Sequence, residues 1–241
     1  MVSANQHRAL ITGASSGIGK ATALEFARSG IDLALVGRDQ SKLDDVAAAA
    51  RQLGVTAQAY SVDLSQVAEV KSRIAAIASE FGLIDILINN AGMGYTGDLL
   101  TTPLEDWQKV MDLNVTSVFQ CIQALLPQMR DRQQGTIINV ASIAGYQAFP
   151  GWGAYNVSKA ALLTLSKTLA AEESPHGIRV MTISPGAVNT PIWDTDTVQA
   201  DFDRSRMLTP EAVAQSILHA ALLPAYAVIS EMMLMPSAGT L

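Results

Sequence analysis

"RALITGASSGIG" runs from Arg8 to Gly19 and decides how the rest of the chain is interpreted. The apolar run 8–12 is typical of a buried strand, and Gly13, Gly17 and Gly19 punctuate the turn that leads from it into a helical pattern. Glycine lets the backbone approach a ligand closely, and the start of a helix offers unpaired N–H groups and a positive dipole end. An ordinary glycine-rich turn has similar residues, but at the start of an alternating chain this one predicts a pyrophosphate site.

Short apolar runs alternate with helical patterns along the whole chain. We expect strands at 8–12, 32–37, 57–62, 85–89, 136–141, 179–184 and 231–236. We expect helices at 17–29, 41–53, 66–81, 104–131, 154–173 and 209–223, with Ser41 and Thr209 as N-caps and Gly54 as a C′ residue. Strands this apolar indicate a parallel sheet covered on both faces. The alternation predicts a doubly wound α/β sheet in one domain, 1–241.

Two segments break the alternation, 143–153 and 185–208. A connection of about two dozen residues inside a compact domain is usually a functional lid or a disordered segment. Both segments follow the carboxyl ends of strands, where ligands bind in open α/β sheets. We therefore expect a substrate loop at about 187–208.

Composition excludes several functional classes. The 241 residues are 49% hydrophobic and carry a net charge of −6, which argues against disorder, a nucleic-acid partner and an anionic membrane surface. The single cysteine, Cys121, is interpreted as a packing residue and indicates a cytoplasmic setting. Three scattered histidines predict no metal site. The chain has no run near the roughly 18 apolar residues of a membrane span, and its start resembles no signal peptide.

"YNVSK" (155–159) places a phenol and an ammonium four residues apart. On a helix these positions share one face, and a cation beside a phenol lowers the phenol's pKa. Tyr155 and Lys159 would thus suit proton transfer near neutral pH, although the same pair also occurs by chance on helix surfaces. Ser142 follows the strand 136–141, so its hydroxyl is expected at the carboxyl edge of the sheet, where it could polarise a carbonyl.

Six stretches occur in an order and at spacings typical of one family. They are "TGASSGIG" (12–19), "NNAG" (89–92), Asn114, Ser142, "YNVSK" (155–159) and "PGAVNT" (185–190). Over roughly 8–190 the chain resembles the single-domain short-chain dehydrogenases/reductases. The resemblance implies a Rossmann-type seven-stranded parallel sheet with the order 3-2-1-4-5-6-7. It also implies a homo-oligomer, either a tetramer or a dimer.

The resemblance assigns roles to particular residues. Tyr155 is implied as the proton donor and Ser142 as the group that binds the carbonyl oxygen. Lys159 is implied to lower the pKa of Tyr155 and to bind the nicotinamide ribose, and Asn114 to join a water-linked proton relay. The implied cofactor-binding residues are Gly13, Ser15, Ser16, Gly17, Ile18, Gly19, Arg38, Asp63, Leu64, Asn90, Ala91, Gly92, Tyr155, Lys159, Pro185, Gly186, Val188 and Thr190.

The end of the second strand distinguishes the two nicotinamide dinucleotides. An acid there binds the ribose hydroxyls of NAD, whereas a basic group accommodates the extra phosphate of NADP. Gly37 stands where the family's NAD-type acid usually stands, and Arg38 offers a planar donor fork. Asp39 could pair with Arg38 instead. We predict NADP(H) as the cofactor.

The two long loops are expected to form the walls of the substrate pocket with Tyr95, Ala144, Tyr146, Trp152 and Trp193. We expect NADPH-dependent reduction of a ketone or aldehyde, reversible as alcohol oxidation. One alternative function is that of a 3-oxoacyl thioester reductase, in which Arg130 and Arg132 could bind an acidic carrier protein. The ending "EMMLMPSAGTL" departs from the "VDGG" of many such reductases. A non-catalytic NADP(H)-sensing protein is the alternative from another class.

Overall fold

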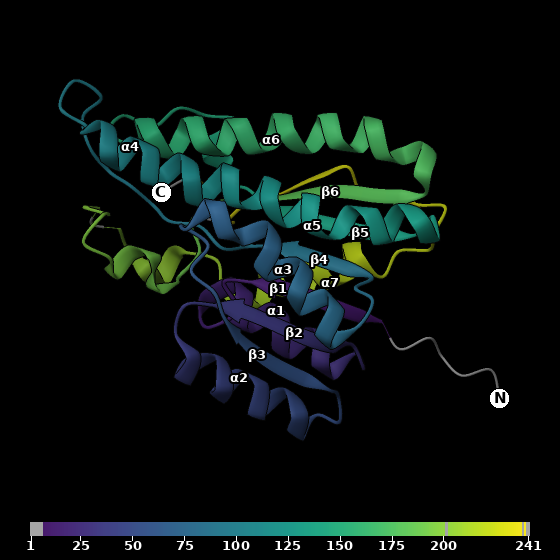
Figure 1. The fold of residues 1–241 in the computed structure, drawn as a ribbon. Coiled ribbons are helices and arrows are strands. Elements are labelled where there is room, and N and C mark those ends of the chain that lie inside the picture. Colours follow the sequence, from purple (N-terminus) through teal and green to yellow (C-terminus); the bar gives the residue numbers. More distant parts are fainter. Residues whose placement is uncertain (1–6, 201, 238, 240–241) are drawn as a thin grey trace.

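The computed structural model describes residues 7–200, 202–237 and 239. The interpretations of the amino-terminal stretch and of the chain's ending therefore fall partly outside the described residues. Figure 1 shows the elements in chain order. They are β1 (Arg8–Thr12), α1 (Gly17–Arg28), β2 (Asp32–Gly37), α2 (Gln40–Gln52), β3 (Ala57–Ser61), α3 (Val67–Phe81), β4 (Ile86–Asn89), α4 (Leu104–Met111), α5 (Ser117–Arg132), β5 (Gly135–Val140), α6 (Gly153–Glu173), β6 (Ile178–Pro185), α7 (Pro210–Ala221) and β7 (Glu231–Leu234).

One parallel sheet of seven strands carries the fold, in the order β3-β2-β1-β4-β5-β6-β7. The expected architecture and strand order are confirmed. β1 pairs with β2 on one side and with β4 on the other, so the winding reverses next to β1. In open α/β sheets a ligand crevice opens at such a reversal, outside the carboxyl ends of the strands.

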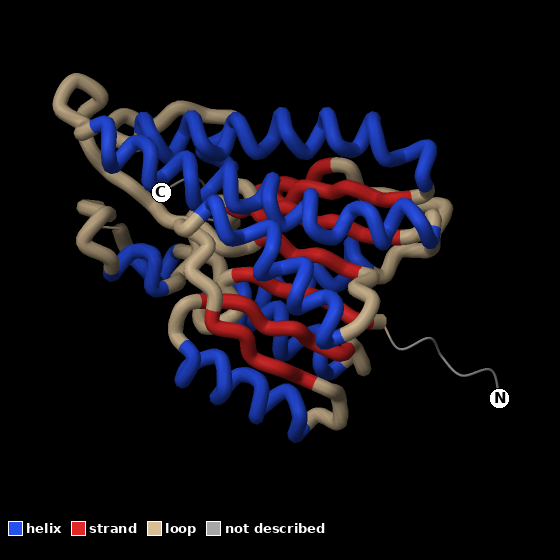
Figure 2. The backbone as a smooth tube through the Cα atoms, in the orientation of Figure 1, coloured by secondary structure: helices blue, strands red, loops and turns tan. Residues whose placement is uncertain are grey.

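Alternate residues of each central strand enter opposite helix layers. Ala9 and Ile11 belong to a core that includes Phe26 of α1 and Ile217 of α7. Leu10, between them, belongs to the core shared with α3, α5 and α6. Because successive strand side chains point to opposite faces, one short apolar run serves both cores. Figure 2 shows the resulting sheet between two layers of helices.

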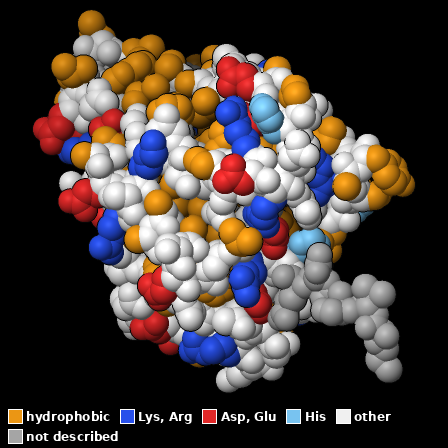
Figure 3. Space-filling model, turned by 45° about the vertical axis from the view of Figure 1, so that its right-hand side comes forward, with side chains coloured by type: hydrophobic (Ala, Val, Ile, Leu, Met, Phe, Trp, Pro, Cys, Tyr) orange, Lys and Arg blue, Asp and Glu red, His pale blue; other side chains and the backbone are white. Residues whose placement is uncertain are grey.

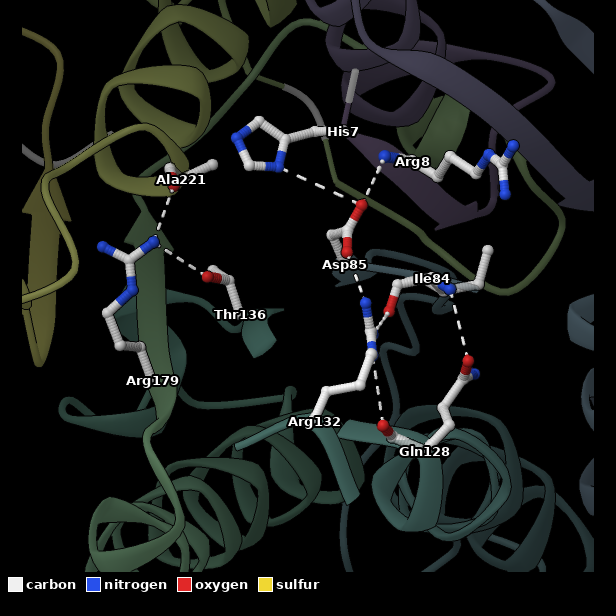
Figure 4. A network of polar contacts seen from close by, with 9 residues as sticks. All are labelled: His7, Arg8, Ile84, Asp85, Gln128, Arg132, Thr136, Arg179 and Ala221. Atoms are coloured by element: carbon white, nitrogen blue, oxygen red, sulfur yellow. Dashed lines mark hydrogen bonds and ion pairs between the residues drawn. The ribbon is translucent and has the colours of Figure 1, made fainter. Parts of the chain in front are cut away.

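The amino edge of the sheet is held by a polar network, drawn in Figure 4. The Asp85 carboxylate, just before β4, accepts a hydrogen bond from the Arg8 N–H (2.9 Å) and pairs with Arg132 (2.6 Å). Arg179 at the start of β6 donates to Thr136 Oγ1 of β5 and to the Ala221 carbonyl oxygen, both at 2.9 Å. This network ties four strands together at the edge opposite the ligand crevice.

The helix ends confirm two expectations and overturn one. Gly54 has φ +92° after α2, and the Thr209 side chain accepts from the Ala212 N–H (3.2 Å) at the start of α7. The N-cap of α2 is Asp39, not Ser41, because the Asp39 carboxylate accepts from the Lys42 N–H (3.1 Å). A carboxylate at the N-cap also interacts favourably with the helix dipole.

Two further expectations are wrong in detail. The single helix expected at 104–131 is divided by a π-helical turn, Asp112–Thr116, between α4 and α5. The strands at the two edges are not covered on both faces, since Glu231 and Met233 of β7 are exposed and β3 is buried only at its start. An edge strand lacks a neighbouring strand on one side, and the helices that flank the sheet do not cover both of its faces here.

Two observations concern membranes and metals. Among the residues that the structure describes, no helix is long and apolar enough to cross a membrane. No group of three His, Cys, Asp or Glu side chains in the same described part of the chain is arranged to hold a metal ion. Cys121 is buried in α5, and burial raises the pKa of its thiol to about 12. The thiol is therefore protonated and packed.

Candidate active site

A cavity of about 1000 Å³ opens along the carboxyl edge of the sheet. Its walls come from the turn after β1, the ends of β2, β4 and β5, the start of α6 and the segment after β6. The structure brings these expected residues together in its lining: Gly13, Ser15, Ser16, Gly17, Ile18, Arg38, Leu64, Asn90, Ala91, Gly92, Ser142, Ala144, Trp152, Tyr155, Lys159, Pro185, Gly186, Val188, Thr190 and Trp193. Gly19, Asp63, Asn114, Tyr95 and Tyr146 are not part of the lining.

The glycines of the first turn stand where the neighbouring chain approaches too closely for a side chain. Gly13 and Gly17 adopt φ values of +66° and +52°, which L side chains rarely adopt. A Cβ at Gly13 would lie 2.8 Å from Asn90 Nδ2, and one at Gly17 would lie 3.1 Å from Thr190 Cγ2. Gly19 has a different role, because a Cβ there would overlap the Gly13 carbonyl. The turn is a backbone cradle that fits a pyrophosphate at the amino end of α1.

Arg38 follows β2 and lines the same cavity. Asp39 caps α2 and pairs with Lys42 (3.3 Å), so the expected competitor for Arg38 is engaged elsewhere. Lys42 also lines the cavity beside Arg38. Sequence inspection missed Lys42 because its position in the first turn of α2 suggests only a solvated helix residue. Arg38, Lys42 and its partner Asp39 together mark the end of the cavity next to β2.

Tyr155 and Lys159 lie one turn apart on α6, as expected, but their relationship differs from the expected one. Lys159 is 5% exposed, and its Nζ lies 5.7 Å from the centroid of the Tyr155 ring. Burial lowers the pKa of Lys159 to about 8. Burial raises the pKa of Tyr155, and the nearby Ser142 hydroxyl offsets part of that rise. The structure thus corrects the expectation that Lys159 lowers the pKa of Tyr155, since desolvation dominates.

Ser142 is held in place by the turn that it begins. It caps the short 3₁₀ turn Ile143–Gly145, and its Oγ accepts a hydrogen bond from the Ala144 N–H (3.1 Å). That bond occupies an acceptor site of the hydroxyl and leaves its proton free to be donated. The hydroxyl faces Tyr155 in the cavity lining.

Asn114 lies behind the cavity wall, in the π-helical turn. Its Nδ2 donates to the Met93 carbonyl (2.9 Å) and to Ser158 Oγ (3.0 Å), and its Oδ1 accepts from the Met93 N–H (2.8 Å). A Cβ at Gly92 would lie 3.1 Å from Asn114 Oδ1 and 3.6 Å from Lys159 Nζ. Asn114 therefore supports the wall next to Lys159. π-Helical turns of this kind occur frequently at functional sites.

The substrate loop forms hydrogen bonds between its own two ends and with a second loop, which contains Thr96. The Asn189 N–H donates to the Leu208 carbonyl, and the Leu208 N–H donates to the Ala187 carbonyl, both at 2.9 Å. Near its middle, the Gln199 N–H donates to Thr96 Oγ1 (2.7 Å). Figure 1 shows this yellow-green segment standing at the carboxyl edge of the sheet.

Two expected pocket residues point elsewhere. The Tyr95 hydroxyl donates to the Asp106 carboxylate (3.2 Å) on α4, and the exposed Tyr146 donates to Glu231 of β7 (2.7 Å). Asp63 is likewise not part of the lining, and its carboxylate accepts hydrogen bonds from the Ser65 N–H (3.0 Å) and hydroxyl (2.8 Å). In each case a polar partner outside the cavity holds the side chain. The lining includes apolar residues that the sequence analysis missed, among them Ile192, Val198 and Phe202.

The sheet order and the cavity at its carboxyl edge define a Rossmann-like α/β protein. The chain belongs to the short-chain dehydrogenase family of oxidoreductases, whose family model matches residues 7–200. The match covers the glycine cradle, Ser142, Tyr155 and Lys159.

Three similar proteins illustrate the relationship. An uncharacterized oxidoreductase of Staphylococcus epidermidis is 30% identical over 236 residues, covering 98% of this chain and 100% of the relative. A 3-oxoacyl-[acyl-carrier-protein] reductase of Synechocystis sp. is 37% identical over 228 residues, covering 92% of each. An alcohol dehydrogenase from the archaeon Thermococcus sibiricus, solved in complex with 5-hydroxy-NADP, has a TM-score of 0.87 at 28% identity and covers 96% of this chain and 97% of its own.

Proposed function

We propose that the protein is an NADPH-dependent oxidoreductase that reduces a ketone or aldehyde to an alcohol, reversibly. The observation that carries the proposal is that Ser142, Tyr155, Lys159 and the glycine cradle line one cavity of about 1000 Å³. A hydroxyl, a phenol and an ammonium beside a pyrophosphate cradle are the groups that carbonyl reduction requires.

The residues present fit a nicotinamide dinucleotide. The cradle of Gly13 and Gly17 would hold the pyrophosphate, and Arg38 would bind the extra phosphate of NADP. Next along the cavity, Lys159 would bind the nicotinamide ribose. The other residues that the family resemblance implies as cofactor contacts are Ser15, Ser16, Ile18, Asp63, Leu64, Asn90, Ala91, Gly92, Pro185, Gly186, Val188 and Thr190. The T. sibiricus neighbour, solved with an NADP derivative, supports this choice. The cofactor supplies the hydride.

The side chains handle the charge that develops on the substrate oxygen. Ser142 donates a hydrogen bond to the carbonyl oxygen and polarises it. Tyr155 then gives its proton to that oxygen. Because burial raises its pKa, the phenol is protonated at neutral pH and ready to act as the acid. Lys159, with a pKa of about 8, still carries its proton there and resupplies the phenol, with Asn114 supporting the relay.

A second candidate is a 3-oxoacyl thioester reductase, which the Synechocystis relative favours. The arginines expected to meet an acidic carrier protein are engaged within the chain. Arg130 makes two hydrogen bonds to the buried Glu173 (2.8 and 2.5 Å), and Arg132 pairs with Asp85 (2.6 Å). On the face drawn in Figure 3, basic and acidic side chains are interspersed and form no basic patch. These observations favour a small free carbonyl compound as the substrate.

The proposal extends to a homo-oligomeric, cytoplasmic protein. Phe119 on α5 and Val157 on α6 are 41% and 43% exposed, and such apolar side chains suit a subunit contact. The one cysteine, Cys121, is compatible with a reducing compartment.

Loss of NADPH absorbance tests the proposal, with an aryl ketone, a β-keto ester, a short aldehyde and a 3-oxoacyl thioester as substrates. We expect turnover of free carbonyl compounds, faster with NADPH than with NADH. Turnover of the thioester alone would select the second candidate. Tight binding of NADPH with no turnover of any substrate would contradict catalysis and leave the non-catalytic alternative.

A further inference from the structure

Four aromatic rings form a continuous row along the substrate half of the cavity. Tyr155 and Trp152 have centroids 5.5 Å apart, Trp152 and Trp193 5.8 Å, and Trp193 and Phe202 5.3 Å. Each contact is edge-to-face, with interplanar angles of 63°, 71° and 85°. Such contacts are the preferred geometry of aromatic pairs. All four residues, which we call the aromatic row, line the cavity.

The row joins two separate parts of the chain. Trp152 and Tyr155 stand at the start of α6, whereas Trp193 and Phe202 belong to the substrate loop. The Trp193 Nε1–H donates to the Val188 carbonyl (2.7 Å), so the polar group of the indole is already bonded. The surface that Trp193 leaves for a ligand is therefore apolar. A flat group placed against the row would contact Tyr155 at one end.

Charge is distributed unevenly along the cavity. Arg38, Asp39 and Lys42 line the end next to β2, and Lys159 lies beside Tyr155. Among the described residues of the substrate loop, the one charged side chain in the lining is the exposed Asp196. Arg204 of that loop does not line the cavity and donates instead to Asn189 Oδ1 (2.8 Å) and the Thr190 carbonyl (3.2 Å). Apart from Lys159, which the proposed function assigns to the nicotinamide ribose, no cation among the described residues lines the substrate half, and an anionic substituent there would meet the Asp196 carboxylate.

Resting on the proposed function, we infer that the substrate is a ketone or aldehyde bearing an uncharged aryl group, and that Trp193 and Phe202 select it. The row offers ring faces and edges to a flat substituent, and the acid Asp196 disfavours a carboxylate or phosphate on it. A small aliphatic substituent would leave part of the apolar wall in contact with water, so it would be bound less tightly.

The test compares acetophenone, butanone and the anionic aryl ketone benzoylformate. For the wild-type protein we expect kcat/KM for acetophenone to exceed both others by about tenfold or more. In Trp193→Leu and Phe202→Leu the acetophenone-to-butanone ratio should fall by about tenfold. Phe202→Leu removes no hydrogen bond, so it separates loss of the ring from loss of the bond to Val188. Tyr226→Leu, at a residue 93% exposed and outside the lining, should leave the ratio unchanged.

A binding measurement gives an independent readout. With NADP⁺ present, acetophenone cannot be reduced, and its Kd can be measured by calorimetry in each variant. We expect Phe202→Leu to weaken binding by about tenfold and Tyr226→Leu to have no effect. Equal kcat/KM for acetophenone and butanone, or an unchanged ratio in both loop variants, would overturn the inference. If no carbonyl compound is turned over, the proposed function fails, and the change in Kd still decides whether the row binds aryl groups.

Discussion

The ammonium group of Lys159 donates a hydrogen bond to the Val140 carbonyl oxygen, with 3.1 Å between the two atoms. Val140 ends β5, and Lys159 stands on the second turn of α6. The bond therefore fastens the helix that carries Tyr155 to the edge of the sheet. It also holds the Lys159 ammonium in a buried position away from water, and this burial lowers the pKa of Lys159 to about 8. A charge held there lowers the free energy of unfolding.

Lys159→Met should stabilise the protein while it abolishes turnover. The unfolded lysine has a pKa of about 10.4 and the folded one about 8, so between these values the unfolded chain binds more protons. The cost of burying the charged Lys159 is thus fully present below about pH 8, and it disappears as the pH rises from the folded pKa to the unfolded pKa. The substitution also removes the hydrogen bond to Val140, which offsets part of the effect. We expect the free energy of unfolding to rise by about 1–2 kcal/mol near neutral pH and by less at about pH 10. Urea unfolding at both pH values measures it, with the exposed Lys71→Met as control; a less stable variant at neutral pH would contradict the prediction.

Tyr155→Phe should lower kcat by about 10²- to 10⁴-fold and leave the Kd for NADPH nearly unchanged, because it removes one proton donor and little else. Stopped-flow turnover and fluorescence titration with NADPH measure the two quantities. The matched control is Tyr146→Phe, which removes a hydroxyl bonded to Glu231 outside the cavity and should keep full activity. Unchanged turnover in Tyr155→Phe would remove this residue as the acid.

The two reaction directions should respond oppositely to pH. Reduction needs the protonated phenol of Tyr155, whose pKa is raised by burial, so its rate should hold through neutral pH. It should fall above about pH 8 as Lys159 loses its proton. Alcohol oxidation needs the phenolate and should rise with pH over the same range. Initial rates in both directions across a pH series measure this; parallel profiles would be inconsistent with Tyr155 as the shared acid and base.

Arg38→Asp should move the cofactor preference from NADPH toward NADH. The substitution replaces a donor for the extra phosphate with a carboxylate that repels it and that can bind ribose hydroxyls. We expect the ratio of kcat/KM values for the two cofactors to change by at least about tenfold. Lys71→Asp makes the same charge change on an exposed position of α3 and should leave the ratio as it is. An unaltered ratio in Arg38→Asp would exclude Arg38 as the selective residue.

Gly19→Ala should destabilise the protein far more than Gly54→Ala. A Cβ at Gly19 would overlap the Gly13 carbonyl and lie 2.6 Å from Asn90 Nδ2, whereas one at Gly54 would meet nothing within 4 Å. We expect a loss of several kcal/mol for Gly19→Ala, and about 1 kcal/mol for Gly54→Ala, where only the backbone conformation is strained. Thermal unfolding of both variants measures this; similar midpoints would show that the turn can relax.

The sequence predicted the fold well where the hydrophobic periodicity of a segment matches the strand or helix that the segment forms. The strand at 8–12 and its glycine turn needed only periodicity, while the strand order came from family resemblance. Periodicity did not show the π-helical turn Asp112–Thr116, because one extra residue in a turn leaves the apolar pattern of 104–131 almost intact. The N-cap was misplaced because Asp39 and Ser41 are both good capping residues, and only the backbone path distinguishes them.

In the candidate site, the sequence predicted the positions of residues that a strand end or a helix turn fixes. It did not predict the positions of side chains that are fixed by a hydrogen bond to a residue far away in the sequence. Ser142, Tyr155 and Lys159 lie together because backbone geometry directs them to one edge. Tyr95 and Tyr146 occur in equally suitable loops, but their hydroxyls bind Asp106 and Glu231 from other elements. Nothing local in the sequence indicates those partners. The pKa of Tyr155 was misjudged for the same reason, since burial is a property of the whole fold.

Ala187 and Asn189 are both joined to Leu208 by backbone hydrogen bonds, so the segment between Asn189 and Leu208 leaves and re-enters the molecule at one point. A longer loop between 191 and 207 would therefore not need to move β6 or α7, because closing a longer loop costs little extra entropy. The part of the segment that carries Trp193 and Phe202 can thus be changed separately from Ser142, Tyr155 and Lys159, which belong to other elements.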